Sequence, residues 1–272
     1  MLKGFLWYAL NNDKHDYMQM SYLLAKSIKT HCKINSVCVI TNTDKVPASL
    51  RKIADHVRIM KQDDSEHEEW KLGNEYKSLA LTPYTHTIKL EADMLATTNI
   101  DFWWHFLCQH NMVFSHDCYD YKGKRINKGH YRKLWEYNNL PNIYSGLTYF
   151  RKSKEAQKFF EICKFIYKNW EYVKENILIR CHDKNATTDM VFSLACKIAD
   201  PLQNRKIDYD WFKFVHNKDH INDIPDARDS MRYLNPIFHA GDVWLGNYRQ
   251  HRMLHYHNKK YTEMFNGRYL VI

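Results

Sequence analysis

Two acidic residues one position apart are the part of this chain whose spacing most clearly suggests chemistry. Glu91 and Asp93 follow the apolar run at residues 87–90 and precede Met94 and Leu95. If that run is a strand, both carboxylates lie at its carboxyl end, where open α/β sheets bind their ligands. Carboxylate oxygens are hard ligands that can hold a divalent cation against a diphosphate. The pair therefore predicts a metal and nucleotide site, with a solvated turn after a strand as the alternative.

The elements that must position these carboxylates alternate along the first hundred residues. Short apolar runs predict strands at residues 5–10, 37–41, 56–60 and 85–90. Apolar spacing predicts helices at residues 17–28, 47–54 and 75–81, and Asp16 is expected to cap the first of them. This alternation predicts an α/β fold with a mainly parallel, doubly wound sheet and helices on both faces.

The second half of the chain is expected to complete that sheet. Strands are expected at residues 112–115 and 143–150, the second of them broken by Ser145 and Gly146. Helices are expected at residues 100–107, 153–175 and 188–199, with Asn99 and Ser153 as caps of the first two. From residue 201 onward the sequence is aromatic and rich in histidine, and an irregular C-terminal part is expected.

Composition narrows the class of protein. A chain of 272 residues, 44% of them hydrophobic, suits one domain with one good core. The net charge of +9 suits an anionic partner such as a nucleotide or nucleic acid, or simply a basic surface. The seven scattered cysteines suit reduced thiols. Because no signal peptide and no run of roughly 18 to 20 apolar residues is found, a soluble, cytoplasmic protein is expected.

Several segments, taken in order, resemble the GT-A nucleotide-sugar glycosyltransferases, especially the glycogenin-like group and its phage-encoded relatives. Residues 76–84 look like the helix and turn before that family's acid-x-acid strand, and residues 142–150 resemble its Asn-Ser-Gly strand. The resemblance covers about residues 1–245. It implies a GT-A type fold with a nucleotide-binding half (1–100) and an acceptor half (101–245), followed by a basic, His-rich extension (246–272).

The resemblance also implies a metal cofactor, Mn²⁺ or Mg²⁺. Asp93 and His239, the latter in His239-Ala240-Gly241, are the expected ligands, with a satisfied buried histidine as the alternative for His239. The mixed oxygen and imidazole set leans toward Mn²⁺. Glu91 stands where the family usually has Asp, so it is expected to bind the metal or to hydrogen-bond the ribose. Such a cation would stabilise the negative charge that develops on a leaving diphosphate.

A nucleotide-sugar donor, expected to be UDP-linked, implies further contacts. Tyr8, Ala9 and Asn11 end the first strand and are candidates to hold the nucleotide base. Lys77, on the helix before the acids, is a candidate phosphate ligand, with an ordinary exposed lysine as the alternative.

The sugar end of the donor implies three more residues. Ser145 and Gly146 would let a sugar approach the backbone closely, although a simple strand bulge would look the same. Asp189 resembles the family's acid at the head of a helix, so it is expected to contact sugar hydroxyls or to act as the base toward the acceptor. A plain helix cap is the alternative.

Basic residues interleaved with tyrosines predict the acceptor side. This pattern follows phosphates and stacks on bases, and the candidates are Lys122, Lys124, Arg125, Lys128 and Tyr131. The favoured acceptor is a modified base, such as 5-hydroxymethylcytosine in bacteriophage DNA, flipped into the pocket in the cytoplasm of the host bacterium. The same transfer to a glycan, lipopolysaccharide or protein, and an inactive nucleic-acid-binding module on this fold, are the alternatives.

Overall fold

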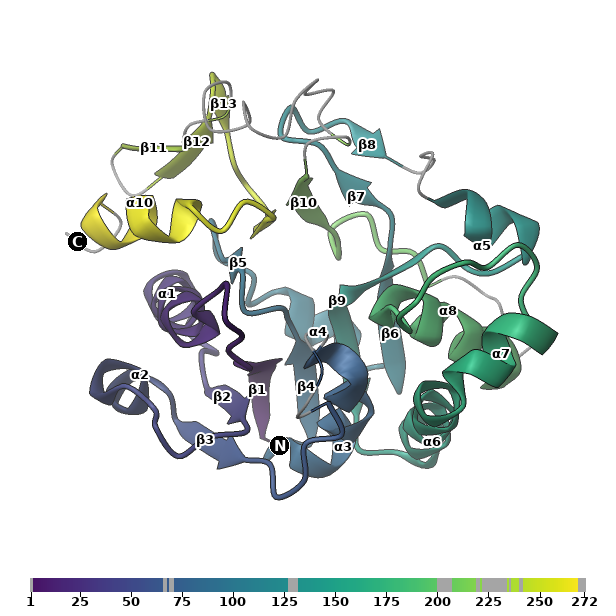
Figure 1. Cartoon of the computed structure of the whole chain (residues 1–272). Coiled ribbons are helices and arrows are strands. Elements are labelled where there is room, and N and C mark those ends of the chain that lie inside the picture. The colour runs from purple at the N-terminus through teal and green to yellow at the C-terminus, as the bar shows by residue number, and fades with distance from the viewer. Residues whose placement is uncertain are drawn as a thin grey trace.

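The computed structural model describes residues 2–65, 68, 71–126, 132–199, 207–218, 221, 234, 236–239 and 242–268. Its central sheet has six strands in the order β3-β2-β1-β4-β9-β6 (Figure 1). The first four along the chain are parallel, whereas β9 runs antiparallel to both of its neighbours. Their bounds are β1 Lys3–Tyr8, β2 Val37–Thr41, β3 His56–Ile59, β4 His86–Lys89, β6 Met112–His116 and β9 Ile143–Arg151.

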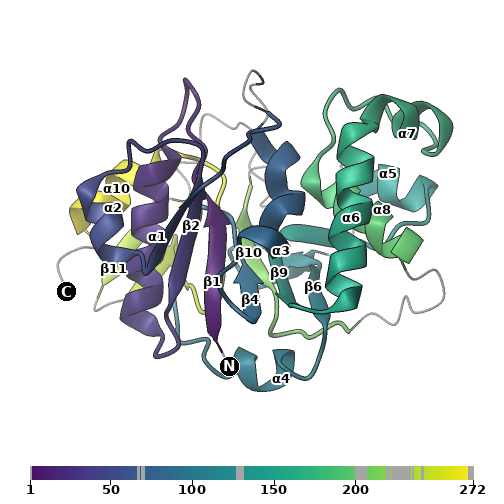
Figure 2. The same ribbon diagram turned by 90° about the horizontal axis from the view of Figure 1, so that it is seen from below.

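Helices cover both faces of this sheet, as the sequence predicted. Alternate side chains of β1 enter different cores: Phe5 and Trp7 pack with α1 (Tyr17–His31), whereas Leu6 packs with α6 (Lys154–Lys168) and α8 (Thr188–Ala199). Figure 2 shows α1 and α2 (Ala48–Ile53) on one side of the sheet and α6 on the other. Strands buried on both faces explain why their sequences read as continuous apolar runs.

A second sheet lies beyond the carboxyl end of β4 and combines strands that are distant in sequence. Its order is β5-β14-β10-β7-β8. The strands are short, with bounds β5 Met94–Leu95, β7 Cys118–Tyr119, β8 Arg125–Ile126, β10 Phe214–Asn217 and β14 Met253–Tyr256. This sheet carries residues of the C-terminal part to the edge of the central sheet.

The C-terminal part, expected to be irregular, thus contributes strands to the fold. Besides β10 and β14, the described residues there form a three-stranded antiparallel sheet and a last helix. These elements are β11 Pro236–His239, β12 Asp242–Leu245, β13 Tyr248–Arg249 and α10 Tyr261–Arg268. Strands of two to four residues show too little alternation to be recognised by periodicity.

Local capping signals explain where several helices begin. Asp16 accepts hydrogen bonds from the backbone N–H groups of Met18 and Gln19, and Ser153 accepts one from Ala156 at the start of α6. The long helix expected from residue 153 is divided at Asn169, and α7 (Trp170–Asn176) follows. The remaining short helices are η1 Lys71–Lys77, a 3-10 helix, α3 Ser78–Leu81, α4 Trp103–Leu107 and α5 Lys133–Tyr137. Across the described ranges, no helix has both the length and the apolar character that crossing a membrane requires.

Candidate metal and nucleotide site

A cleft of about 450 Å³ lies at the carboxyl ends of β1 and β4. Strand order reverses there, because β2 and β3 extend from one side of β1 while β4, β9 and β6 extend from the other. Tyr8 and Leu10 line the cleft from the end of β1, and Glu91 and Asp93 line it from the end of β4. This is the switch point at which open α/β sheets bind ligands.

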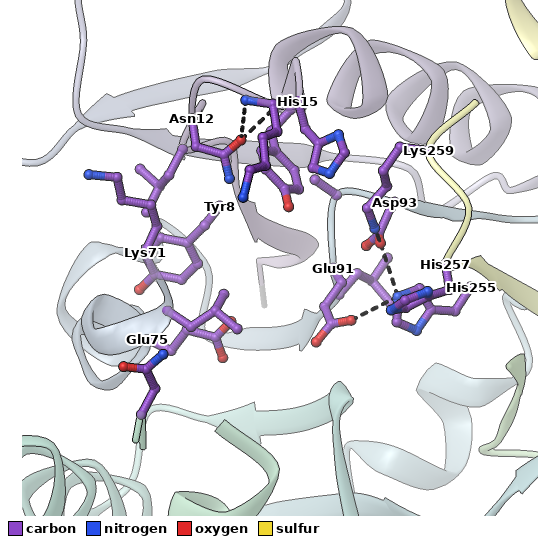
Figure 3. A pocket seen from close by; sticks show the side chains of 17 residues that line it. Tyr8, Asn12, His15, Lys71, Glu75, Glu91, Asp93, His255, His257 and Lys259 are labelled. Atoms are coloured by element: carbon purple, nitrogen blue, oxygen red, sulfur yellow. Dashed lines mark hydrogen bonds and ion pairs between the residues drawn. The ribbon is translucent and has the colours of Figure 1, made fainter. Parts of the chain in front are cut away.

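Three side chains meet on one wall of this cleft. The ligand atoms of Glu91, Asp93 and His255 all lie within 4.8 Å of one another. His255 Nε2 is 3.1 Å from Glu91 Oε2 and 3.1 Å from Asp93 Oδ2 (Figure 3). The sequence predicted the two acids together, but it assigned the histidine to a different position.

Strand pairing explains how His255 reaches the acids. The loop after β4 turns at once into β5, which pairs antiparallel with β14 and places His255 opposite Met94. The backbone N–H of Tyr256 also donates to the carbonyl of Asp93 at 3.1 Å. The segment that carries Glu91 and Asp93 is therefore fixed to β14 by main-chain hydrogen bonds.

Positive charge surrounds Asp93. Its Oδ2 accepts hydrogen bonds from His255 Nε2 and from the Lys259 ammonium. Burial opposes ionisation of Asp93, but the charges of His255 and Lys259 outweigh it and hold the pKa of this carboxyl well below its usual range. Burial likewise opposes protonation of His255, yet Asp93 and then Glu91 raise the pKa of its imidazole.

The three ligand atoms suit a divalent cation. Burial raises the pKa of Glu91, and the neighbouring Asp93 charge raises it further against the opposing effect of His255. In the protein alone, His255 and Lys259 offset the charge of the two carboxylates, and a divalent cation would take the place of the His255 proton, because a histidine binds metal in its neutral form. Oxygen ligands combined with one imidazole suit Mn²⁺, and Mg²⁺ less closely.

His216 supports His255 from behind. The two Nδ1 atoms are 3.0 Å apart, and both rings are buried. Burial, followed by the charge of His255, holds the pKa of His216 well below its usual range. The neutral His216 ring can accept the Nδ1–H proton of His255, which keeps His255 Nε2 directed at the carboxylates.

A second cavity of about 200 Å³ adjoins the first and shares Glu91 and His255 with it. Ser145, Gly146 and Asp189, three of the site candidates predicted from the sequence, line it together. Its remaining lining residues are Leu72, Arg132, Tyr144, Thr187, Thr188, Phe214, His216, Lys218 and His257. The two cavities therefore meet at Glu91 and His255.

Asp189 is held firmly in this second cavity. One carboxylate oxygen accepts hydrogen bonds from the Ser145 N–H and hydroxyl at 2.8 and 2.7 Å, and the other is 2.5 Å from Arg132 Nη2. Arg132 itself lies against the rings of Trp135 and Tyr144. Burial opposes the charge of Asp189, but Arg132 and the Ser145 hydrogen bonds lower its pKa overall.

Gly146 makes room for Glu91. A Cβ at this position would lie 3.0 Å from Glu91 Cδ and 3.1 Å from Met94 Cε. A sugar was expected from the sequence to approach the backbone closely at Gly146. In the protein without ligand, the Glu91 carboxylate is the group that lies close to it.

The other predicted donor-site residues occupy varied positions. Tyr8 lines the first cleft, and its hydroxyl is 3.1 Å from Ser78 Oγ and donates to the carbonyl of Asn74 at 3.2 Å. Ala9 is fully buried and Asn11 bonds to the helix cap at Asp16, so neither lines the cleft. The neighbouring Asn12 does line it.

Lys77 does not line the cleft, and the structure does not test the predicted role of His239. Lys77 Nζ donates to the carbonyl of Gln62 and lies 3.3 Å from Asp64 Oδ2, whereas Lys71 of the same helix lines the cleft. His239 ends β11, where its backbone pairs with Asp242 in the three-stranded sheet; its side chain lies outside the described part of the chain.

The predicted acceptor residues lie on and after the β7–β8 hairpin. Lys122 and Lys124 are exposed, and their backbone N–H groups donate to the Asp120 carboxylate. Arg125 Nη2 is 2.6 Å from Asp117 Oδ2 and 2.5 Å from Asp208 Oδ2, so its charge is offset locally. Lys128 and Tyr131 lie outside the described residues.

Neither a protein-family model nor a curated protein sequence matches the chain. Solved structures do resemble it. The galactosyltransferase LgtC, in complex with donor and acceptor sugar analogues, is 11% identical with a TM-score of 0.51, over 97% of this chain and 95% of LgtC. Mouse xyloside xylosyltransferase 1 is 10% identical with a TM-score of 0.49, over 93% and 97% of the two chains.

The glycosyltransferase GlyE of Streptococcus pneumoniae is 9% identical with a TM-score of 0.46, and the match covers 76% of this chain but only 45% of GlyE. The identities show likeness of fold and no more. The match to LgtC along nearly the whole of both chains confirms the expected fold, and this protein is a mixed α/β chain of GT-A type.

Proposed function

We propose that this protein is a metal-dependent glycosyltransferase that moves a sugar from a nucleotide diphosphate donor, UDP-linked, to an acceptor hydroxyl. One observation carries the proposal: Glu91, Asp93 and His255 converge in a cleft at the switch point of a GT-A sheet, beside a second cavity. The likeness in fold to a galactosyltransferase supports the same class of reaction.

The proposed reaction breaks the bond between the anomeric carbon and a diphosphate oxygen and joins that carbon to the acceptor oxygen. Glu91, Asp93 and His255 would hold a divalent cation, which would supply positive charge to the departing diphosphate. Lys259 lies beside Asp93 in the same cleft, so its ammonium is placed to neutralise further phosphate charge. Lys71 approaches the cleft from η1 as another candidate phosphate ligand.

The remaining groups would orient the sugar and acceptor. Because Arg132 and Ser145 stabilise the charged form of Asp189, this carboxylate is a weak base. Its proposed role is therefore to accept hydrogen bonds from sugar hydroxyls in the second cavity. Because a weak base does not readily remove the proton of the acceptor hydroxyl, the departing diphosphate is the proposed acceptor of that proton.

For the acceptor we retain the proposal of a hydroxymethylated base in DNA. The exposed Lys122 and Lys124, and the edge-to-face pair of Tyr121 and Tyr248, support it as a basic and aromatic surface. The ion pairs of Arg125 with acids favour the second candidate, a glycan acceptor, because they reduce the charge available to phosphates.

The test uses the full chain with Mn²⁺ and a panel of nucleotide sugars. Without an acceptor, slow release of the free sugar from one donor is expected, and EDTA should stop it. Transfer to hydroxymethylated DNA, and not to unmodified DNA, would select the first acceptor, whereas transfer to a glycan alone would select the second. Absence of both hydrolysis and transfer with every donor would contradict the proposal.

A further inference from the structure

A buried ion pair joins a residue that lines the first cavity to the backbone of a residue that lines the second. Lys89, the last residue of β4, is fully buried, and its Nζ lies 2.5 Å from Oε2 of Glu75 in η1. The same ammonium donates to the carbonyl of Ser145 at 3.2 Å. The Glu75 side chain is only 3% exposed, yet Glu75 lines the first cleft.

Stability alone does not account for this pair. Removing a carboxylate and an ammonium from water costs free energy that their attraction barely repays, and apolar residues of similar size usually stabilise a core at least as well. Burial raises the pKa of Glu75 to about 7 in spite of Lys89, which reflects that cost. A charged pair kept at the edge of a ligand cleft instead indicates a role toward the ligand.

The position of Glu75 restricts what it can contact. Figure 3 shows Glu75 across the cleft from Glu91, Asp93 and His255. Leu72, from the same helix, lines both cavities. A carboxylate repels a diphosphate, so the phosphates belong near the cation ligands and Lys259. Because an ionised Glu only accepts hydrogen bonds, an uncharged part of the donor that carries hydroxyl groups suits the place beside Glu75.

We propose that Glu75 is a sugar-recognition residue, whose carboxylate accepts hydrogen bonds from hydroxyl groups of the donor sugar while Lys89 holds it in place. This inference rests on the proposed function. Through the Ser145 carbonyl, Lys89 also connects Glu75 to the hydrogen bonds that hold Asp189, so both carboxylates face the sugar from one rigid frame.

The experiment compares the binding of UDP with that of UDP-sugars in Mn²⁺, by calorimetry. The variant is E75L/K89M, which removes the pair without leaving a buried charge alone. It should bind UDP within about twofold of the unmodified protein but bind the preferred UDP-sugar about tenfold more weakly, since hydrogen bonds to a charged group are lost. K213M is the matched control, because Lys213 is also fully buried, is paired with Asp208, and lines neither cavity.

The outcomes separate this inference from the proposed function. If the unmodified protein binds no nucleotide or nucleotide sugar with Mn²⁺, both are overturned. If it binds them and E75L/K89M keeps the same ratio of UDP-sugar to UDP affinity, or loses both affinities equally, only the role of Glu75 is overturned. A K213M variant with the same selective loss would also overturn it, since the effect would then reflect core damage.

Discussion

Replacing Lys89 alone should destabilise the protein far more than replacing it together with Glu75. Both side chains lie in the core, at 0% and 3% exposure, with the charged atoms 2.5 Å apart. With an effective dielectric constant of about 20, the attraction at that distance is about 7 kcal/mol. Methionine at position 89 removes this attraction together with the cost of burying the ammonium, and leaves the Glu75 carboxylate without its cation. Broken buried pairs lose a net of about 3–5 kcal/mol, which is the expected cost of K89M.

The assay is the free energy of unfolding by urea at pH 8, measured for the unmodified protein, K89M, E75L and E75L/K89M. The double variant should lie within about 1 kcal/mol of the unmodified protein or be more stable, because no buried charge remains. E75L leaves the Lys89 ammonium unpaired and should lose a similar amount, so the coupling energy of the cycle should be about the sum of the two single losses. A K89M variant as stable as the unmodified protein, or a double variant as unstable as K89M, would refute this account of the pair.

Three other predictions concern the pH response, the diphosphate and the acceptor. Glu75 binds its proton more tightly in the folded protein, where its pKa is raised from 4.5 to about 7, so its stabilising contribution is complete below pH 4.5 and is lost as pH rises through 7. That loss is about 3 kcal/mol and should be missing from E75L/K89M. Urea unfolding of both proteins between pH 4 and 8 measures it, and an equal pH dependence of their free energies of unfolding would contradict it. K259M should weaken UDP binding in Mn²⁺ about tenfold, and unchanged calorimetric affinity would exclude Lys259 as a phosphate ligand. K122A/K124A should lower the slope of log affinity for DNA against log salt by about 2, and an identical slope would place DNA elsewhere or nowhere on this protein.

Local sequence signals predicted the front half of the fold well. The strand at residues 37–41 was expected with the bounds that β2 has, and Asp16 caps α1 as its sequence indicated. These elements are specified by neighbouring residues: continuous apolar runs for strands buried on both faces, and a capping carboxylate for the helix. Right-handed connections between parallel strands leave few ways to arrange such strands and helices, so their packing follows from the alternating pattern.

The candidate site was predictable only where its residues are close in sequence or open an element. Glu91 and Asp93 share one strand end, and Ser145 and Asp189 stand at positions that the resemblance indicated; the structure brings all four to adjoining cavities. From the sequence, His255 was included only within the basic, His-rich extension at residues 246–272. It is 162 residues from Asp93, and the contact depends on pairing a two-residue strand with a four-residue one, which leaves no periodic signal.

The helix type at residues 71–81 was not predicted from the sequence. An α-helix was expected from residue 75, whereas a 3-10 helix covers Lys71–Lys77 before α3 begins. Lys71 and Glu75 line the cleft, while Lys77 Nζ lies 3.3 Å from Asp64 Oδ2.

Binding of UDP in the presence and absence of Mn²⁺ tests the central claim most directly, with His255→Ala and His239→Ala as paired variants. We expect the unmodified protein to bind UDP in Mn²⁺ and not in EDTA, with a stabilisation of about 2.7 kcal/mol at a hundred times the Kd. His255→Ala should lose the Mn²⁺-dependent response, because it removes a ligand from the cluster with Glu91 and Asp93, and His239→Ala should retain it. Equal UDP binding with Mn²⁺ and EDTA, or a full response from His255→Ala, would contradict a metal and nucleotide site at these residues.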